Sequence, residues 1–269
     1  MTFAEASAIH GSPGTWTAEV EEGWDIFGVS NGGYLMAIAT RAMEAETGGR
    51  CLISATGHYL NPTTPGPVSI EIATLKDGRS LSTLRARVAR EDRSLLTVTA
   101  VLADPGRPVF DQDLVTGEPP RLPPPDECLT VEPAQDGPLP PPFSGKVEVR
   151  IHPDDFAVYT DEKSESALMR GWFRLRDGEP MDMHAVVLAT DAFPPAIFNT
   201  DLPVGWTPTI DLNVQVRNPS PTGWLACRLA TRFVTDGMLE EDGELWDEAG
   251  RLVALSRQLA LVPARPAQA

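Results

Sequence analysis

The sequence has little of what a disulfide-rich, metal-binding or nucleic-acid-binding protein requires. Its 269 residues include three cysteines and four histidines, without a Cys-x-x-Cys or His-x-x-x-His pattern. We therefore expect a reducing, cytoplasmic setting, with no metal site and no metal or redox cofactor. Basic residues are also scarce, because 22 Lys and Arg stand against 38 Asp and Glu, a net charge of −16. Such an anionic protein repels phosphate backbones, which disfavours general nucleic-acid binding.

Long apolar runs are missing as well. No stretch approaches the 18 or so uninterrupted apolar residues of a transmembrane helix, and no basic segment followed by an apolar run opens the chain. We therefore expect neither a membrane span nor a secretory signal. The length, with 42% hydrophobic residues, is enough for one or two globular domains with a core of their own.

Proline, in contrast, is abundant and unevenly placed. Ten of the 26 prolines lie between residues 119 and 142. Proline lacks a backbone donor and is excluded from helix interiors and central strands, so this segment is expected to be a linker or an extended surface strap. The sequence thus predicts an N-terminal domain (1–115), a Pro-rich linker (116–145) and a C-terminal domain (146–269).

The N-terminal half reads as one helix followed by a sheet. Asn31 is a candidate N-cap, and apolar residues recur at helical spacing from Tyr34 to Glu46. This helix is apolar over most of its surface, so it is expected to be well buried. Alternating runs ending at turn signals predict four antiparallel strands. These strands are 51–60, 68–75, 82–90 and 95–102.

The C-terminal half repeats this pattern, with a helix from Met183 to Phe193 ended by Pro194. Strands follow at 209–217, 224–233, 243–247 and 252–261. Asn61-Pro62 falls on Asn218-Pro219 and Asp77-Gly78 on Asp236-Gly237, at offsets of 157 and 159 residues. Near-constant offsets indicate an internal duplication, although turn residues are common and chance is the alternative. A buried helix followed by a long antiparallel sheet suggests a sheet wrapped around its helix.

Several segments resemble one family. They are NGGYLMAIATRA, GHYLNPTTPGPVSIEIATLKDGRSLSTLRARV, LATDAFPPAIF, PTIDLNVQVRN and LVALSRQLAL. Together they are similar to the double-hotdog thioesterases of the acyl-CoA thioesterase II-like family. The resemblance implies an α+β double hotdog, with two copies of an antiparallel sheet around a long helix. It also implies a thioester hydrolase of lipid metabolism that cleaves acyl-CoA with water, without an acyl-enzyme, and a homodimer of double hotdogs.

The same resemblance implies the site residues. By motif position, the family's catalytic Asp, Thr or Ser, and Gln fall on Asp211, Thr231 and Gln258. The overlay of the two halves puts Ser54, Thr74 and Ala100 opposite them, which predicts one active site per chain on the second copy. Each also has an ordinary interpretation, because all three stand in predicted strands, where Asp211 and Gln258 could face solvent and threonine is common.

Gly32 and Gly33 have two interpretations: a helix-entry device, or substrate-binding residues that offer backbone N–H groups to the thioester carbonyl. His184 is expected to be a packed core histidine. Asp191 could brace the helix end or contact the site. The acidic residues of 240–248 are expected on a solvated hairpin. Arg85, Arg87 and Arg90 could meet CoA phosphates or be ordinary surface residues.

Two other functions stay open. One is a hotdog enoyl-CoA hydratase or dehydratase-like enzyme, which needs a histidine paired with an acid. His184 and Asp191, seven residues apart, could provide that pair on one helix face. The other is a non-catalytic acyl-CoA-binding protein that keeps the ligand tunnel without the chemistry.

Overall fold

The computed structural model describes residues 1–107, 112–134, 139–160 and 163–263. The rest of the chain, including part of the expected linker and the last six residues of the expected C-terminal domain, lies outside the described residues.

The N-terminal half is built around helix α2 (Gly32–Glu46). The Asn31 side chain caps it by accepting a hydrogen bond of 2.9 Å from the Tyr34 amide, as the sequence predicts. Leu35, Ile38 and Met43 are at most 2% exposed, so the helix is embedded as expected. Around it lie the four expected strands, with a short N-terminal segment at the edge. The strands are β5 (Cys51–Tyr59), β6 (Gly66–Asp77), β7 (Leu81–Arg90) and β8 (Arg93–Ala103). The N-terminal segment comprises α1 (Phe3–Ala6), β1 (His10–Ser12), β2 (Thr15–Val20), β3 (Asp25–Ile26) and β4 (Val29–Ser30).

The C-terminal half is built around α3 (Met183–Ala189), which is shorter than the expected helix to Phe193. The Thr190 and Asp191 amides already bond to carbonyls three residues back, at 3.3 and 3.1 Å, so the helix tightens and stops. Prolines 194 and 195 follow and cannot continue it. The strands are β9 (Leu129–Thr130), β10 (Val147–Ile151), β11 (Leu168–Leu175), β12 (Thr209–Val216), β13 (Leu225–Ala230), β14 (Val234–Thr235), β15 (Met238–Trp246) and β16 (Leu252–Leu261). The 3-10 turns are η1 (Pro142–Gly145), η2 (Pro153–Asp155), η3 (Ala157–Tyr159) and η4 (Ala196–Asn199).

The duplication inferred from the sequence is visible in the strand order. In the first half the neighbours run β5-β8-β7-β6, and in the second they run β12-β16-β15-β13. The hydrogen bonds just after β5 and β12 also match. The Asn61 amide donates to the Leu95 carbonyl at 3.2 Å, and the Asn218 amide donates to the Val253 carbonyl at 3.1 Å. Each half is an antiparallel sheet around one helix, so the protein has the expected double-hotdog α+β fold, with a long helix only in the first copy.

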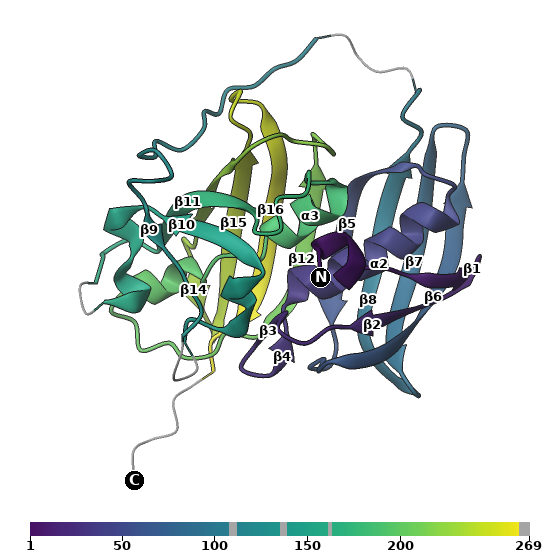
Figure 1. The fold of residues 1–269 in the computed structure, drawn as a ribbon, viewed down its shortest axis with the longest axis horizontal. Helices are drawn as coiled ribbons and strands as arrows, with labels where there is room; N and C mark the ends of the chain where they lie inside the picture. Colours follow the sequence, from purple (N-terminus) through teal and green to yellow (C-terminus); the bar gives the residue numbers. More distant parts are fainter. Residues whose placement is uncertain (108–111, 135–138, 161–162, 264–269) are drawn as a thin grey trace.

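The two halves join along β5 and β12, which pair antiparallel and make one continuous sheet (Figure 1). The Asn213 side chain of β12 donates a 2.8 Å hydrogen bond to the Thr56 hydroxyl of β5 across this junction. Helices α2 and α3 also pack against each other on the inner side. The first turn of α2 therefore lies beside the end of α3, and this neighbourhood forms the site described below.

The described part of the Pro-rich segment contains no α-helix. It lies against the second half, where the Trp172 indole donates a 2.8 Å hydrogen bond to the Pro123 carbonyl. Part of it, β9, pairs with β10 as an edge strand of the sheet. Among the described residues, no helix is both long and apolar enough to cross a membrane.

Candidate active site

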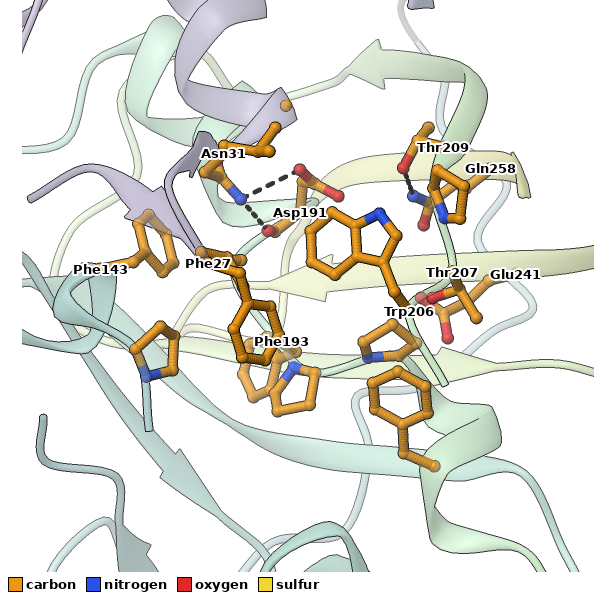
Figure 2. Close-up of a pocket in the computed structure, with 18 of the residues that line it drawn as sticks. Phe27, Asn31, Phe143, Asp191, Phe193, Trp206, Thr207, Thr209, Glu241 and Gln258 are labelled. Atoms are coloured by element: carbon orange, nitrogen blue, oxygen red, sulfur yellow. Dashed lines mark hydrogen bonds between the residues drawn. The ribbon is translucent and has the colours of Figure 1, made fainter. Parts of the chain in front are cut away.

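A cavity of about 930 Å³ opens between the two halves. Its lining includes residues at the start of α2, residues that follow α3, and the cavity-facing ends of β12, β15 and β16. Figure 2 shows that aromatic side chains make up much of the wall and that two polar groups of residues lie apart, with Trp206 between them. The labelled aromatic residues are Phe27, Phe143, Phe193 and Trp206.

Asp191 is the centre of the first polar group. Its Oδ2 accepts a 2.8 Å hydrogen bond from the Gly33 amide and a 3.1 Å bond from the Asn31 side chain. The Asn31 amide nitrogen also donates to the Asp191 carbonyl at 2.7 Å. Burial raises the pKa of Asp191 to about 6, although the bonds from Gly33, Gly32 and Asn31 favour its charged form. At neutral pH Asp191 is therefore an ionised carboxylate facing the cavity.

The close approach of Asp191 to α2 depends on glycine. A Cβ on Gly33 would lie 2.9 Å from the Asp191 Cβ and 3.0 Å from the Leu188 carbonyl oxygen. A Cβ on Gly32 would lie 3.0 Å from both Asp191 and the Tyr59 ring. Gly32 lines the cavity as a substrate-binding residue would. The Gly33 amide, for which a contact with a substrate carbonyl was one of two interpretations, donates to Asp191.

The second polar group crosses three neighbouring strands. Gln258 of β16 lines the cavity and donates from its side-chain nitrogen to the Thr209 hydroxyl of β12. Gln258 pairs in register with Glu241 of β15, so both side chains leave the sheet on the same face. The Glu241 carboxylate accepts a 2.6 Å hydrogen bond from the Ala196 amide. Burial, aided by the charges of Asp191 and Glu240, raises the pKa of Glu241 to about 7.

Asp211 and Thr231 lie elsewhere. Asp211 is paired in register with His58 and Leu259 and precedes the buried Leu212, so its side chain leaves the opposite face of the sheet. Thr231 follows the end of β13, one residue beyond the strand, and its buried hydroxyl has no hydrogen-bond partner among the described residues. Of the expected catalytic residues, only Gln258 is among the described residues that line the cavity.

The acidic hairpin expected to be solvated is partly buried. Glu241 and Asp247 are only 4% and 3% exposed, which makes the expectation wrong for these two residues. Asp247 is held by Arg251 at 2.8 Å, whereas Glu241 faces the cavity. Alternation could have revealed this, because Glu241 shares its strand face with Leu239 and Leu245.

His184 is buried in contact with α2, as expected of a core histidine. Its Nδ1 lies 3.0 Å from the Thr40 hydroxyl and its Nε2 lies 2.8 Å from the Glu44 carboxylate. With both ring nitrogens engaged, it is not arranged with Asp191 as a hydratase pair. In the described part of the chain, no group of three or more His, Cys, Asp or Glu residues is placed to hold a metal ion.

The fold and site thus define a class: a double hotdog whose internal cavity holds a buried carboxylate against a helix N-terminus. Comparison with known families is more specific. A model of the acyl-CoA thioesterase N-terminal domain matches residues 20–103, and one of the C-terminal domain matches residues 125–262. The chain belongs to the acyl-CoA thioesterase family.

Solved structures agree with this assignment. A thioesterase II candidate from Thermobifida fusca YX is 32% identical, with a TM-score of 0.86 and 98% of each chain covered. The acyl-CoA thioesterase II TesB2 from Mycobacterium marinum, at 17% identity, a TM-score of 0.74 and 100% coverage of both chains, shares the fold. An uncharacterized protein of Mycobacterium tuberculosis is 34% identical over 94 residues, or 35% of this chain, and the match spans 32% of that relative's length.

Proposed function

We propose that the protein hydrolyses acyl-CoA thioesters, with a water molecule activated by the Asp191 carboxylate. The observation that carries this proposal is the position of Asp191: a carboxylate that faces an apolar cavity and is held by the first turn of α2. In the reaction, water attacks the thioester carbonyl carbon, Asp191 takes a proton from the water, and the carbon–sulfur bond breaks as that proton passes from Asp191 to the leaving sulfur. The products are a carboxylic acid and free CoA thiol, without a covalent intermediate.

The pKa of Asp191 suits a general base. A base works best when its pKa is near the operating pH, because it is then both ionised and able to bind a proton. With a pKa of about 6, Asp191 is a stronger base than an ordinary aspartate and is still ionised at neutral pH. The N–H groups of α2 offset part of the cost of burying that charge.

Two cavity residues can assist the developing oxyanion. Burial, followed by the charge of Asp191, raises the pKa of Tyr59 well above its usual range, so its hydroxyl stays a proton donor. The Tyr59 ring lies beside Gly32, and among the described residues its hydroxyl has one hydrogen-bond contact, a long 3.9 Å one to the Met36 sulfur. The Gln258 amide, from the second polar group, is the other donor. Such donors stabilise the negative charge that forms on the thioester oxygen.

The apolar wall fits the acyl chain. Leu35, Phe143 and Phe193 line the cavity and are at most 7% exposed, so an acyl chain placed there would leave water for a preformed apolar surface. Phe27 and Trp206 are 53% and 46% exposed, so they lie on the solvent side of the cavity. Their rings pack edge to face, with 5.7 Å between the ring centroids.

The test compares two aspartates, since the family resemblance points to Asp211 and the cavity points to Asp191. Thiol release is measured over short, medium, long and aromatic acyl-CoAs with the wild type, Asp191→Asn and Asp211→Asn. We expect Asp191→Asn to lose about 10²- to 10⁴-fold in kcat, and Asp211→Asn to stay within about threefold. The reverse pattern would return the role to Asp211, with Thr231 and Gln258. Acyl-CoA binding without any thiol release would indicate a binding protein instead.

A further inference from the structure

Glu241 is a buried carboxylate that the proposed reaction does not use. It is 4% exposed, lines the same cavity as Asp191, and belongs to a different strand, β15. Among the described residues, the Ala196 amide donates a short 2.6 Å hydrogen bond to its carboxyl group. Burying a carboxylate is costly, so its placement in the cavity wall calls for a structural or chemical reason.

The segment from Asp191 to Ala196 explains what this bond does. It leaves α3 at Asp191 and carries Phe193, which lines the cavity. Pro194 and Pro195 have no backbone N–H, so the Ala196 amide is the first donor available after Phe193. The segment is thus held at one end by α2, through the Gly33 amide, and at the other end by β15, through Glu241.

We propose that Glu241 is a positioning residue for thioester hydrolysis: it holds the Asp191–Ala196 segment against β15 and so keeps the Asp191 carboxylate in place against α2. This inference rests on the proposed function, because it assigns Glu241 a role toward Asp191. Glu241 does not need to touch the substrate. It acts through the position of the turn that carries Asp191.

The groups around Glu241 determine the pH at which it ionises. Asp191 and Glu240 carry the charges that act on it, the Ala196 amide donates to it, and Gln258 is its cross-strand neighbour. Asp191 has the lower pKa of the two, about 6 against about 7, so it ionises while Glu241 still carries its proton. Replacing Glu241 with the neutral glutamine therefore leaves the pKa of Asp191 and the acid limb of the pH–rate profile unchanged.

Two variants separate position from charge. Glu241→Gln keeps an oxygen that accepts from Ala196 but removes the charge, whereas Glu241→Leu removes both. Glu244→Gln is the matched control, because Glu244 lies on the opposite face of the same strand and pairs with Arg228 at the surface. We expect Glu241→Gln to keep kcat within about threefold and to leave the acid limb of the pH–rate profile in place, because its amide oxygen still accepts from Ala196. We expect Glu241→Leu to lose about tenfold to a hundredfold in kcat with a smaller change in KM, and the control to match the wild type.

A second measurement does not need activity. Carboxyl ¹³C NMR of Asp-labelled protein follows the titration of Asp191, whose signal is identified by its loss in Asp191→Asn. An Asp191 midpoint that moves in Glu241→Leu and stays at the wild-type value in Glu241→Gln supports the inference, even if no acyl-CoA is hydrolysed and the proposed function fails, because a displaced segment disturbs the bonds from Gly33 and Asn31. An Asp191 midpoint that is unchanged in Glu241→Leu would overturn it. Wild-type kcat in a folded Glu241→Leu protein would do the same.

Discussion

The Asp191 carboxylate accepts a 2.8 Å hydrogen bond from the Gly33 amide, 158 residues earlier in the chain. The N-cap residues of α2 and α3 are Asn31 and Asp182, which lie 182 − 31 = 151 residues apart. Adding this offset to Gly33 gives His184, so these two residues occupy equivalent positions in the two copies. The same offset relates Thr40 to Asp191.

The duplication therefore predicts a second contact, between Thr40 and His184, and the structure contains it at 3.0 Å. One contact of the pair involves a carboxylate that faces a cavity, and the other joins a buried histidine to a hydroxyl, with Glu44 on the other ring nitrogen. This difference would explain one site per chain, because only Asp191, and not the related Thr40, carries a carboxylate.

The raised pKa of Asp191 predicts that its ionised carboxylate lowers the free energy of unfolding. The shift from 3.8 to about 6 corresponds to roughly 3 kcal/mol of unfavourable interaction for the charged form. The folded state binds this proton more tightly than the unfolded state. The contribution of Asp191 therefore favours folding most below pH 4 and is lost as the pH rises through 6.

We expect Asp191→Asn to exceed the wild type in stability by about 1–3 kcal/mol at pH 8, because asparagine cannot ionise. The advantage should shrink at pH 5. Urea unfolding at both pH values measures the difference. A variant that is less stable than the wild type by the same amount at both values would contradict the account.

Much of the fold could be predicted from the sequence, because local chemistry sets where its helices and strands begin and end. Asn31 caps α2, and the repeated Asn-Pro and Asp-Gly pairs end strands in both copies at nearly one offset. Helix and strand identity followed from apolar periodicity, which burial in a sheet-wrapped helix enforces. The end of α3 was missed by four residues, because its last turn closes through bonds three residues back that leave no clear sequence pattern.

The site was less accessible, because it depends on distances between segments far apart in the sequence. The family resemblance singled out Asp211, Thr231 and Gln258, but the faces of their strands are decided by the bulge near Ile210 and by the end of β13. The role of Glu241 was hidden by its acidic neighbours, although the alternation within β15 contained the signal.

Gly33 is expected to tolerate no side chain. A Cβ there would lie 2.9 Å from the Asp191 side chain and 3.0 Å from the Leu188 carbonyl, so Gly33→Ala must push α3 away from α2. We expect a loss of about 1–3 kcal/mol in stability and a drop in kcat larger than any change in KM. Gly106→Ala is the control, since its Cβ would make only a 3.4 Å contact to Asp104. Equal stability and kcat for both variants would show that the close helix contact is dispensable.

His184 is expected to matter for folding and not for chemistry. Its ring joins α3 to α2 through Thr40 and Glu44. Removing it leaves an empty space and takes one of two hydrogen-bond partners from the buried Thr40 hydroxyl, which keeps its bond to the Ala37 carbonyl, so His184→Ala should lose about 3 kcal/mol of unfolding free energy. The exposed His10→Ala should change it by less than about 0.5 kcal/mol.

The kinetic outcome decides between two kinds of enzyme. A hydratase would need an imidazole within reach of its substrate, whereas the proposed hydrolysis uses no histidine. Thiol release per folded molecule of His184→Ala should therefore stay within about threefold of the wild type. A well-folded His184→Ala protein that had lost all activity would mean that the ring leaves Thr40 and Glu44 during turnover. Formation of 3-hydroxyacyl-CoA from an enoyl-CoA by the wild type would then identify the reaction as a hydration.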